Sequence, residues 1–306
     1  MAAFLSFNKI GKKNNNVNLL ADLSFGVQKG ESLCILGKSN SGKSVLFQIL
    51  MGIIKKDKGQ IFVNGMDYDI RKNEILPMIG YVPQESIFDE NLNIYDNLLI
   101  YSSLYGLKKN KIKKEIKYWS DILQITKYLK KTINSSPDSI LKKASFVRAL
   151  IHNPDILLMD DITSSMDYYD KNIIFETIQN IQKNKSILFI TQNFNLAEIY
   201  SDRIILIDNG TVAFNGSIQN LDNKINDTYK YRFTFKRIVP SEFLKTVRNN
   251  KEINHITSRD NNLELTIQDK SVFFDIFKIA VNYELVDLKI SNSKLSELFK
   301  KVIDSK

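Results

Sequence analysis

Gly37-Lys38-Ser39-Asn40-Ser41-Gly42-Lys43-Ser44 is the stretch that decides the fold, because it fits the pattern G-x-x-x-x-G-K-[ST]. Gly37 and Gly42 allow the backbone to turn, so that consecutive N–H groups point inward at a β-phosphate. Lys43 adds a point charge for the β- and γ-phosphates, and the Ser44 hydroxyl is suited to bind magnesium. The stretch therefore predicts a loop that binds the phosphates of a nucleoside triphosphate.

The sequence on both sides of this loop has the character that the motif needs. Residues 32–36 form a short apolar run, which predicts a buried strand, and residues 45–50 read as the start of a helix. Further along, strands at 79–84, 156–161, 187–190 and 204–207 alternate with helices at 168–183 and 194–200. This alternation predicts a mostly parallel α/β sheet. The alternative is a tight glycine turn between a strand and a helix, with no ligand.

Length and composition limit the number of domains and the cellular compartment that the sequence is compatible with. With 306 residues there is room for one large domain and one small one. The single cysteine, Cys34, lies in the apolar run, so a disulfide framework is excluded and a reducing compartment is expected. We find neither a signal-peptide pattern nor an apolar run near the roughly 20 residues that span a bilayer.

The net charge of +9 includes a dense lysine cluster between Lys108 and Lys114. Three explanations are open: a solvated helix face, attraction to anionic lipid headgroups, or nucleic-acid binding. Because interleaved aromatic residues and a recognisable nucleic-acid module are missing, no nucleic-acid partner is expected.

Several spaced motifs in a fixed order now make the resemblance specific. After the phosphate loop come Tyr81-Val82-Pro83-Gln84, a helical insert at about 91–153, and the strand that ends in Asp160-Asp161, followed by Thr163-Ser164-Ser165-Met166-Asp167. Over roughly residues 4–220 the chain resembles the nucleotide-binding subunit of an ABC transporter. The resemblance implies a P-loop NTPase fold of class α/β, with a mixed sheet core, an antiparallel β lobe, a helical subdomain, and a nucleotide-binding domain over 1–220.

The resemblance also assigns site residues for the cofactors ATP and Mg²⁺. The nucleotide is expected on residues 37–44 and Gln84, namely Gly37, Lys38, Ser39, Asn40, Ser41, Gly42, Lys43 and Ser44 with Gln84. The magnesium ligands are expected to be Ser44, Gln84 and Asp160. Catalysis is assigned to Lys43, Asp161 and Gln192. Asp161 stands where the family usually has a glutamate as general base, and Gln192 stands where it usually has a histidine.

Two further positions depart from the family pattern. The Gly-rich signature, which faces the ATP of a second subunit, falls on Ser136-Pro137-Asp138-Ser139-Ile140 and has lost both glycines. We expect Ser136 to cap the following helix, with Pro137 as its first residue, and Asp138 to repel a facing γ-phosphate. The adenine-stacking aromatic is expected near Asn14, where Phe7 is a doubtful substitute.

A second domain is expected after a polar linker at 221–228. Over 229–306 the pattern alternates as β-α-β-β-α-β, the order of a ferredoxin-like fold, and predicts a small α+β accessory domain. A last helix would place five apolar residues on one stripe: Leu295, Leu298, Phe299, Val302 and Ile303. Such a tail resembles that of ABC-2 type exporter ATPases.

Three functions remain open at this point. The first is a transport ATPase that couples ATP binding, and slow hydrolysis, to export through a separate integral membrane permease, as a homodimer or heterodimer. The second is a catalytically impaired regulatory or structural subunit, and the third a lipid-trafficking ABC ATPase. The resemblance implies a cytoplasmic protein bound peripherally at the inner face of the cell membrane.

Overall fold

The computed structural model describes residues 3–15, 17–217, 229–250, 252–267 and 270–290, together with Leu295 and Phe299. The chain divides into two compact units, Met1–Ser217 and Ile218–Lys306. The predicted linker at 221–228 and most of the predicted last helix, including Leu298, Val302 and Ile303, lie outside the described residues. Leu295 and Phe299 are helical.

A six-stranded sheet forms the centre of the first unit. Its order is β10-β9-β3-β8-β7-β6, and every neighbouring pair is parallel except β9 with β10. The strands are β3 (Ser32–Gly37), β6 (Ile79–Val82), β7 (Ile156–Asp160), β8 (Ser186–Ile190), β9 (Arg203–Asp208) and β10 (Thr211–Ser217). Since β7 and β8 are buried along their whole length, their continuous apolar runs are what a parallel sheet requires.

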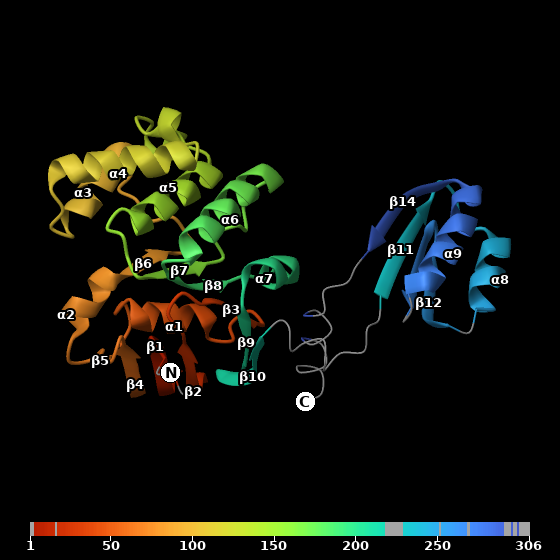
Figure 1. The fold of residues 1–306 in the computed structure, drawn as a ribbon, viewed down its shortest axis with the longest axis horizontal. Coiled ribbons are helices and arrows are strands. Elements are labelled where there is room, and N and C mark those ends of the chain that lie inside the picture. Colours follow the sequence, from red (N-terminus) through yellow and green to blue (C-terminus); the bar gives the residue numbers. More distant parts are fainter. Residues whose placement is uncertain are drawn as a thin grey trace. The chain divides into compact units, whose positions relative to one another are not determined.

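A smaller antiparallel sheet lies next to it, in the order β2-β1-β4-β5. Its strands are β1 (Leu5–Asn14), β2 (Val17–Val27), β4 (Lys58–Val63) and β5 (Met66–Asp67). Helix α1 (Lys43–Leu50) lies between the two sheets, as Figure 1 shows, and Leu46, Phe47 and Leu50 are fully buried in the shared core. This core fixes the helix that follows the phosphate loop.

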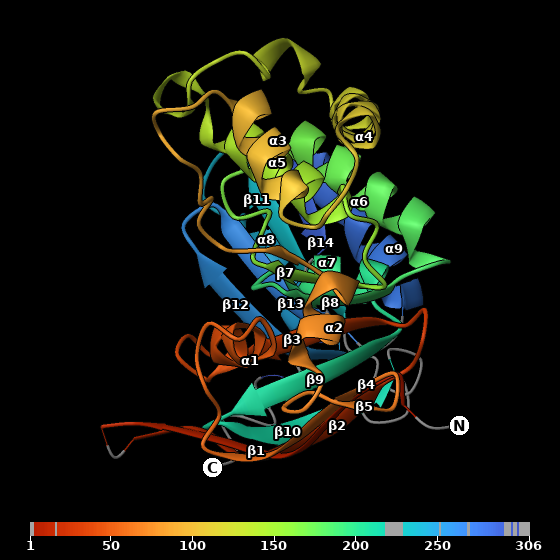
Figure 2. The same ribbon diagram turned by 90° about the vertical axis from the view of Figure 1, so that its left-hand side faces the viewer.

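Helices cover the other side of the central sheet (Figures 1 and 2). They are α3 (Ile94–Ser103), α4 (Lys109–Ile122), α5 (Asp138–Leu150), α6 (Tyr168–Gln182) and α7 (Phe194–Tyr200). The short helix α2 (Lys72–Ile75) lies on the side of α1, since its buried Ile75 belongs to the same core as Phe47. Helices α3, α4 and α5 pack on one another, and α5 contacts β6, so the predicted helical insert is attached to the sheet through α5. In the lysine cluster, the charged side chains lie on the exposed side of α4, opposite the buried Ile112 and Ile116.

The second unit alternates strands and helices in the predicted order. Its elements are β11 (Tyr229–Phe235), α8 (Ser241–Arg248), β12 (Ile253–Arg259), β13 (Asn262–Ile267), α9 (Lys270–Ala280) and β14 (Leu285–Ile290). The sheet is antiparallel throughout, in the order β12-β13-β11-β14. Its core is aromatic, with Phe233, Phe235 and Phe243 almost completely buried.

Candidate functional site

The phosphate loop connects β3 to α1, and its two glycines are sterically required. A Cβ atom on Gly37 would collide with the carbonyl oxygen of Ile207 and with Ser41 Oγ. Gly42 has a φ of 96°, and a Cβ atom there would collide with the carbonyl oxygen of Leu19. Any side chain at these positions would therefore distort the loop.

Lys43 is buried at the first turn of α1 and points back at this loop. Its Nζ donates hydrogen bonds to the carbonyl oxygens of Gly37 (3.0 Å) and Lys38 (2.6 Å) and to Ser41 Oγ (3.2 Å). Burial lowers the pKa of Lys43, and the negative charges of Asp160 and Asp161 act in the opposite direction. The ammonium group thus lies within electrostatic range of both carboxylates.

Ser44 and Asp160, two of the predicted magnesium ligands, lie together. Asp160 is the last residue of β7 and is only 3% exposed. Burial raises the pKa of Asp160, whereas a hydrogen bond from Ser44 lowers it. Hydroxyl and carboxylate oxygens at one point make a donor set suited to Mg²⁺.

Asp161 follows directly and has an unusual backbone. Its φ is 45°, in the left-handed region, and its N–H donates to the carbonyl oxygen of Ile190 at 3.0 Å. Burial raises the pKa of the Asp161 carboxyl, and the positive charges of Lys142, Lys171 and Lys43 oppose this. The two aspartates and the phosphate loop therefore gather at one edge of the sheet, where the carboxyl ends of β3, β7 and β8 meet.

The two predicted glutamines follow strands that end at the same edge. Gln84 lies two residues after β6, and Gln192 lies two residues after β8. Both residues are exposed. The strand register places Val82 beside Met159 and Ile190 beside Asp160. Each glutamine therefore follows a strand residue that is paired with Met159 or Asp160, at the end of β7 that carries the carboxylates.

The signature segment differs from the prediction at its helix start. Ser136 does not cap α5, because its hydroxyl donates to the carbonyl oxygen of Thr132 at 2.9 Å; the N-cap is Pro137, without a side-chain bond, and the helix begins at Asp138. The exposed Asp138 carboxylate accepts a hydrogen bond from Ser165 Oγ. The helix forms as predicted, but its first turn carries a carboxylate where bare N–H groups were needed.

Phe7 is not available to stack on adenine, in line with the expectation that it is a poor substitute for the missing aromatic. Phe7 is 1% exposed and packs on Phe25, with 4.7 Å between ring centroids. Asn14, the position expected for that aromatic, is exposed at the end of the β1–β2 hairpin.

Sequence reasoning missed Lys142, whose charge acts on Asp161. Lys142 is 5% exposed, and its Nζ donates to Ser164 Oγ at 2.8 Å. The helical pattern gave little signal for this, since α5 is buried at every position from Lys142 to Val147 and position 142 is not on the side of Ile140 and Ala144. A lysine there is easily assigned to solvent, because charged residues are seldom buried.

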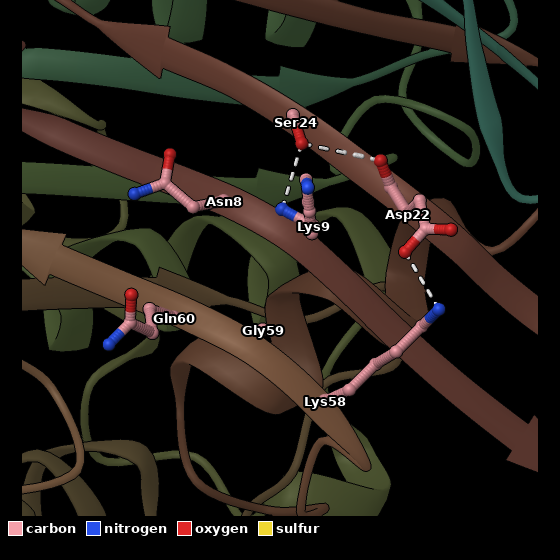
Figure 3. A pocket seen from close by; sticks show the side chains of 7 residues that line it. All are labelled: Asn8, Lys9, Asp22, Ser24, Lys58, Gly59 and Gln60. Atoms are coloured by element: carbon pink, nitrogen blue, oxygen red, sulfur yellow. Dashed lines mark hydrogen bonds and ion pairs between the residues drawn. The ribbon is translucent and has the colours of Figure 1, made fainter.

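A separate polar hollow of about 710 Å³ lies on the antiparallel sheet of the first unit, over β1, β2 and β4 (Figure 3). Its polar groups bond to one another: Lys58 pairs with Asp22 at 2.7 Å, and the N–H of Lys9 donates to Ser24 Oγ at 2.8 Å. It contains none of the predicted site residues.

Two features are absent from the part of the chain that the structure describes. There, no group of three or more His, Cys, Asp and Glu side chains is arranged as a metal site. None of the helices in the same ranges has the length and apolar character needed to cross a membrane.

Comparison with known proteins agrees with this geometry. The profile of the family described as ABC transporter matches residues 20–164. The chain is 28% identical over 230 residues to the ABC transporter ATP-binding protein NatA of Bacillus subtilis, covering 74% of this chain and 93% of NatA. It is 25% identical over 301 residues to the linearmycin resistance ATP-binding protein LnrL of the same bacterium, covering 96% of both chains.

Larger proteins and a solved structure match as well. The chain is 27% identical over 288 residues to the mouse ABC-type organic anion transporter ABCA8B, covering 91% of this chain but only 18% of ABCA8B. A solved structure of an ATP-binding subunit of an ABC transporter has a TM-score of 0.68 at 20% identity, covering 72% of this chain and 93% of that one. The structural likeness supports the fold of the first unit.

Proposed function

Because the chain is an ATP-binding subunit of the ABC transporter family, we propose that it couples ATP binding and slow hydrolysis to export through a separate membrane subunit. The observation that carries the proposal is the meeting of Lys43, Ser44 and Asp160 at the carboxyl edge of the central sheet. A phosphate-binding loop, a cation and a hard-oxygen pair at one point form a set that suits a magnesium-bound triphosphate.

Each residue has a separate role in this proposal. Backbone N–H groups of the phosphate loop hold the β-phosphate, and Lys43 exchanges its bonds with loop carbonyls for bonds with the β- and γ-phosphates. Ser44, Asp160 and Gln84 would hold Mg²⁺, which would neutralise charge on the phosphates when bound. Asp161 accepts a proton from the attacking water, and Gln192 donates a hydrogen bond to the γ-phosphate.

Slow turnover follows from three departures from the family pattern, at Asp161, Gln192 and Asp138. Asp161 is one methylene shorter than the glutamate usual in the family, and Gln192 carries no proton or positive charge. In a dimer that encloses two ATP molecules, Asp138 places a carboxylate near the γ-phosphate of the facing subunit. A homodimer would carry every departure in both sites, while a heterodimer would place Asp161 and Gln192 in one site and Asp138 in the other.

We assign the contact with the membrane permease to the surface around the helical insert. Ile87, Ile100 and Leu104 are 67%, 53% and 77% exposed. Arg148 connects the segment of Ile87 to helix α3. Its guanidinium donates a hydrogen bond to the carbonyl oxygen of Ile87 and lies 5.0 Å from the ring centroid of Tyr101. Apolar side chains so exposed in one region suit a protein contact, which would hold the chain peripherally at the membrane.

The second unit is assigned to the ferredoxin-like class as an accessory domain, over residues 229–306. The β-α-β-β-α-β order and the strand order β12-β13-β11-β14 support this assignment. The match to LnrL covers 96% of both chains and so includes the tail, but the match to ATP-binding cassette sub-family A member 9 of the mouse covers the same share of this chain, so the lipid-trafficking alternative stays open.

The second candidate is a regulatory or structural subunit that binds ATP without useful turnover, which Asp138 and Gln192 favour. The deciding experiment measures MgATP binding and phosphate release by the full-length chain, alone and with its membrane subunit, against K43A as the control. Binding with phosphate release above that control supports the transport ATPase. Binding without such release supports the regulatory subunit, and absence of binding contradicts both.

A further inference from the structure

Lys142 has an environment unlike that of an ordinary helix lysine. It lies in the middle of α5, is 5% exposed, and its Nζ donates to Ser164 Oγ at 2.8 Å. Burying an ammonium group costs free energy unless an opposite charge offsets the cost. The hydroxyl of Ser164 is neutral, so it does not supply that charge. The positive charge of Lys142 acts on Asp161: burial raises the pKa of that carboxyl, and the charges of Lys142, Lys171 and Lys43 oppose this.

Ser164 connects this lysine to the backbone of Asp161. The Ser164 hydroxyl accepts from Lys142 and donates to the carbonyl oxygen of Asp161 at 3.1 Å, and the Ser164 N–H donates to the same oxygen at 3.3 Å. On the other side, the Asp161 N–H is bound to Ile190. Asp161 therefore has both backbone polar groups fixed, in a conformation that non-glycine residues adopt infrequently.

We propose that Lys142 is a positioning residue for ATP hydrolysis, which acts through Ser164 to hold Asp161 in its left-handed conformation. The φ of Asp161 sets the direction of its Cα–Cβ bond, and so sets where the carboxylate meets the attacking water. Lys142 touches neither phosphate nor water in this role. The inference rests on the proposed function, since it assigns the positioning of the proposed base.

The neighbouring Lys143 provides a matched control. It is also buried, at 2% exposed, but it forms an ion pair with Asp170 at the start of α6. Replacing Lys142 by methionine keeps the volume and removes a buried charge that has no carboxylate bonded to it. The same change at Lys143 leaves the Asp170 carboxylate unpaired. The K142M variant should therefore keep its stability, whereas K143M should lose stability.

The kinetic test uses the full-length chain. For K142M we expect kcat for ATP hydrolysis to fall at least about tenfold, with KM for MgATP unchanged within about twofold and with rescue by K142R to within about threefold. For K143M, or the charge-free pair K143M/D170N if K143M does not fold, kcat should stay within about twofold. An unchanged kcat in K142M, or an equal loss in the Lys143 control, overturns the proposal.

A second readout needs no hydrolysis and separates this inference from the proposed function. Hydrogen–deuterium exchange of the nucleotide-free chain reports the amides of Asp161 and Ser164. We expect their exchange to rise at least about tenfold in K142M and in S164A, and no further in the double variant, with little change in the Lys143 control. Unchanged exchange in K142M overturns the inference even if the chain hydrolyses ATP. Raised exchange in a chain without phosphate release supports the positioning while the proposed hydrolysis fails.

Discussion

His152 should make the helical insert lose stability in mild acid, and replacing it should remove that loss. The residue lies just beyond α5, where its ring stacks on Tyr105 with 4.0 Å between centroids. Nε2 lies 3.1 Å from the carbonyl oxygen of Ile79, so Nε2 carries the proton and donates, while the buried Nδ1 has no protein partner. Protonation would place a proton and a charge where nothing accepts them.

The size of the effect follows from the pKa. Burial, with a smaller contribution from the charge of Lys185, lowers the pKa of His152 from 6.5 to about 4, although the bond to Ile79 opposes this. The unfolded chain therefore binds a proton between these two pKa values that the folded chain does not bind. Above pH 6.5 the titration of this residue hardly changes the free energy of unfolding. As the pH is lowered, the free energy of unfolding falls, by about 2 kcal/mol at pH 5 and about 3 kcal/mol near pH 4.

The assay compares urea unfolding of the wild-type chain and H152F at pH 7.5, 6 and 5. Phenylalanine keeps the stacking on Tyr105 but cannot titrate, so the other titrating groups cancel in the difference. The fluorescence of Trp119, the single tryptophan, reports the unfolding of this region. The free energy of unfolding of the wild type should fall by about 2 kcal/mol more than that of H152F between pH 7.5 and 5. A difference within about 0.5 kcal/mol, or an NMR pKa of His152 at 6 or above, would refute the reasoning.

Three further predictions concern the nucleotide site. K43A should weaken MgATP binding at least about tenfold in calorimetry, because it removes the charge that faces the β- and γ-phosphates, and an unchanged Kd would contradict the assigned role. The double variant D161E/Q192H should raise kcat about tenfold or more if these residues limit turnover, and an unchanged phosphate-release rate would show that another step does. D138G should strengthen ATP-dependent dimerisation, measured by light scattering in MgATP, because a carboxylate leaves the facing γ-phosphate; weaker dimerisation would indicate that the Ser165–Asp138 bond is needed instead.

The order of the fold could be predicted because local signals and burial agree. The apolar runs at 156–160 and 187–190 are buried strands, and the glycines at 37 and 42 stand where a side chain would collide with backbone. The meeting of the phosphate loop with Asp160 also follows, since the carboxyl ends of parallel strands share one edge of a sheet. These expectations depend only on short stretches of sequence and on a general rule of sheet topology.

Other features depend on contacts between distant segments, which local patterns do not contain. Ser136 has the composition of an N-cap, but its hydroxyl is engaged by the carbonyl oxygen of Thr132. Phe7 has the chemistry to stack on a base, but its strand position turns it into the core against Phe25. In both cases the residue type allowed the role considered for it, and contacts with a neighbouring residue exclude that role.

The left-handed conformation of Asp161 shows why the site itself could be read only in part. From the sequence, Asp161 is a shorter base at the end of a strand, and its weakness would follow from length alone. In the structure its direction depends on the bond to Ile190 and on the Lys142–Ser164 contact, which come from β8 and α5. If those contacts aim the shorter side chain at the water, D161E alone would overreach and slow the reaction, whereas a deficit of length alone predicts that it speeds up. The sign of the change in kcat for D161E, measured with and without K142M, therefore separates a defective base from one that the fold has compensated.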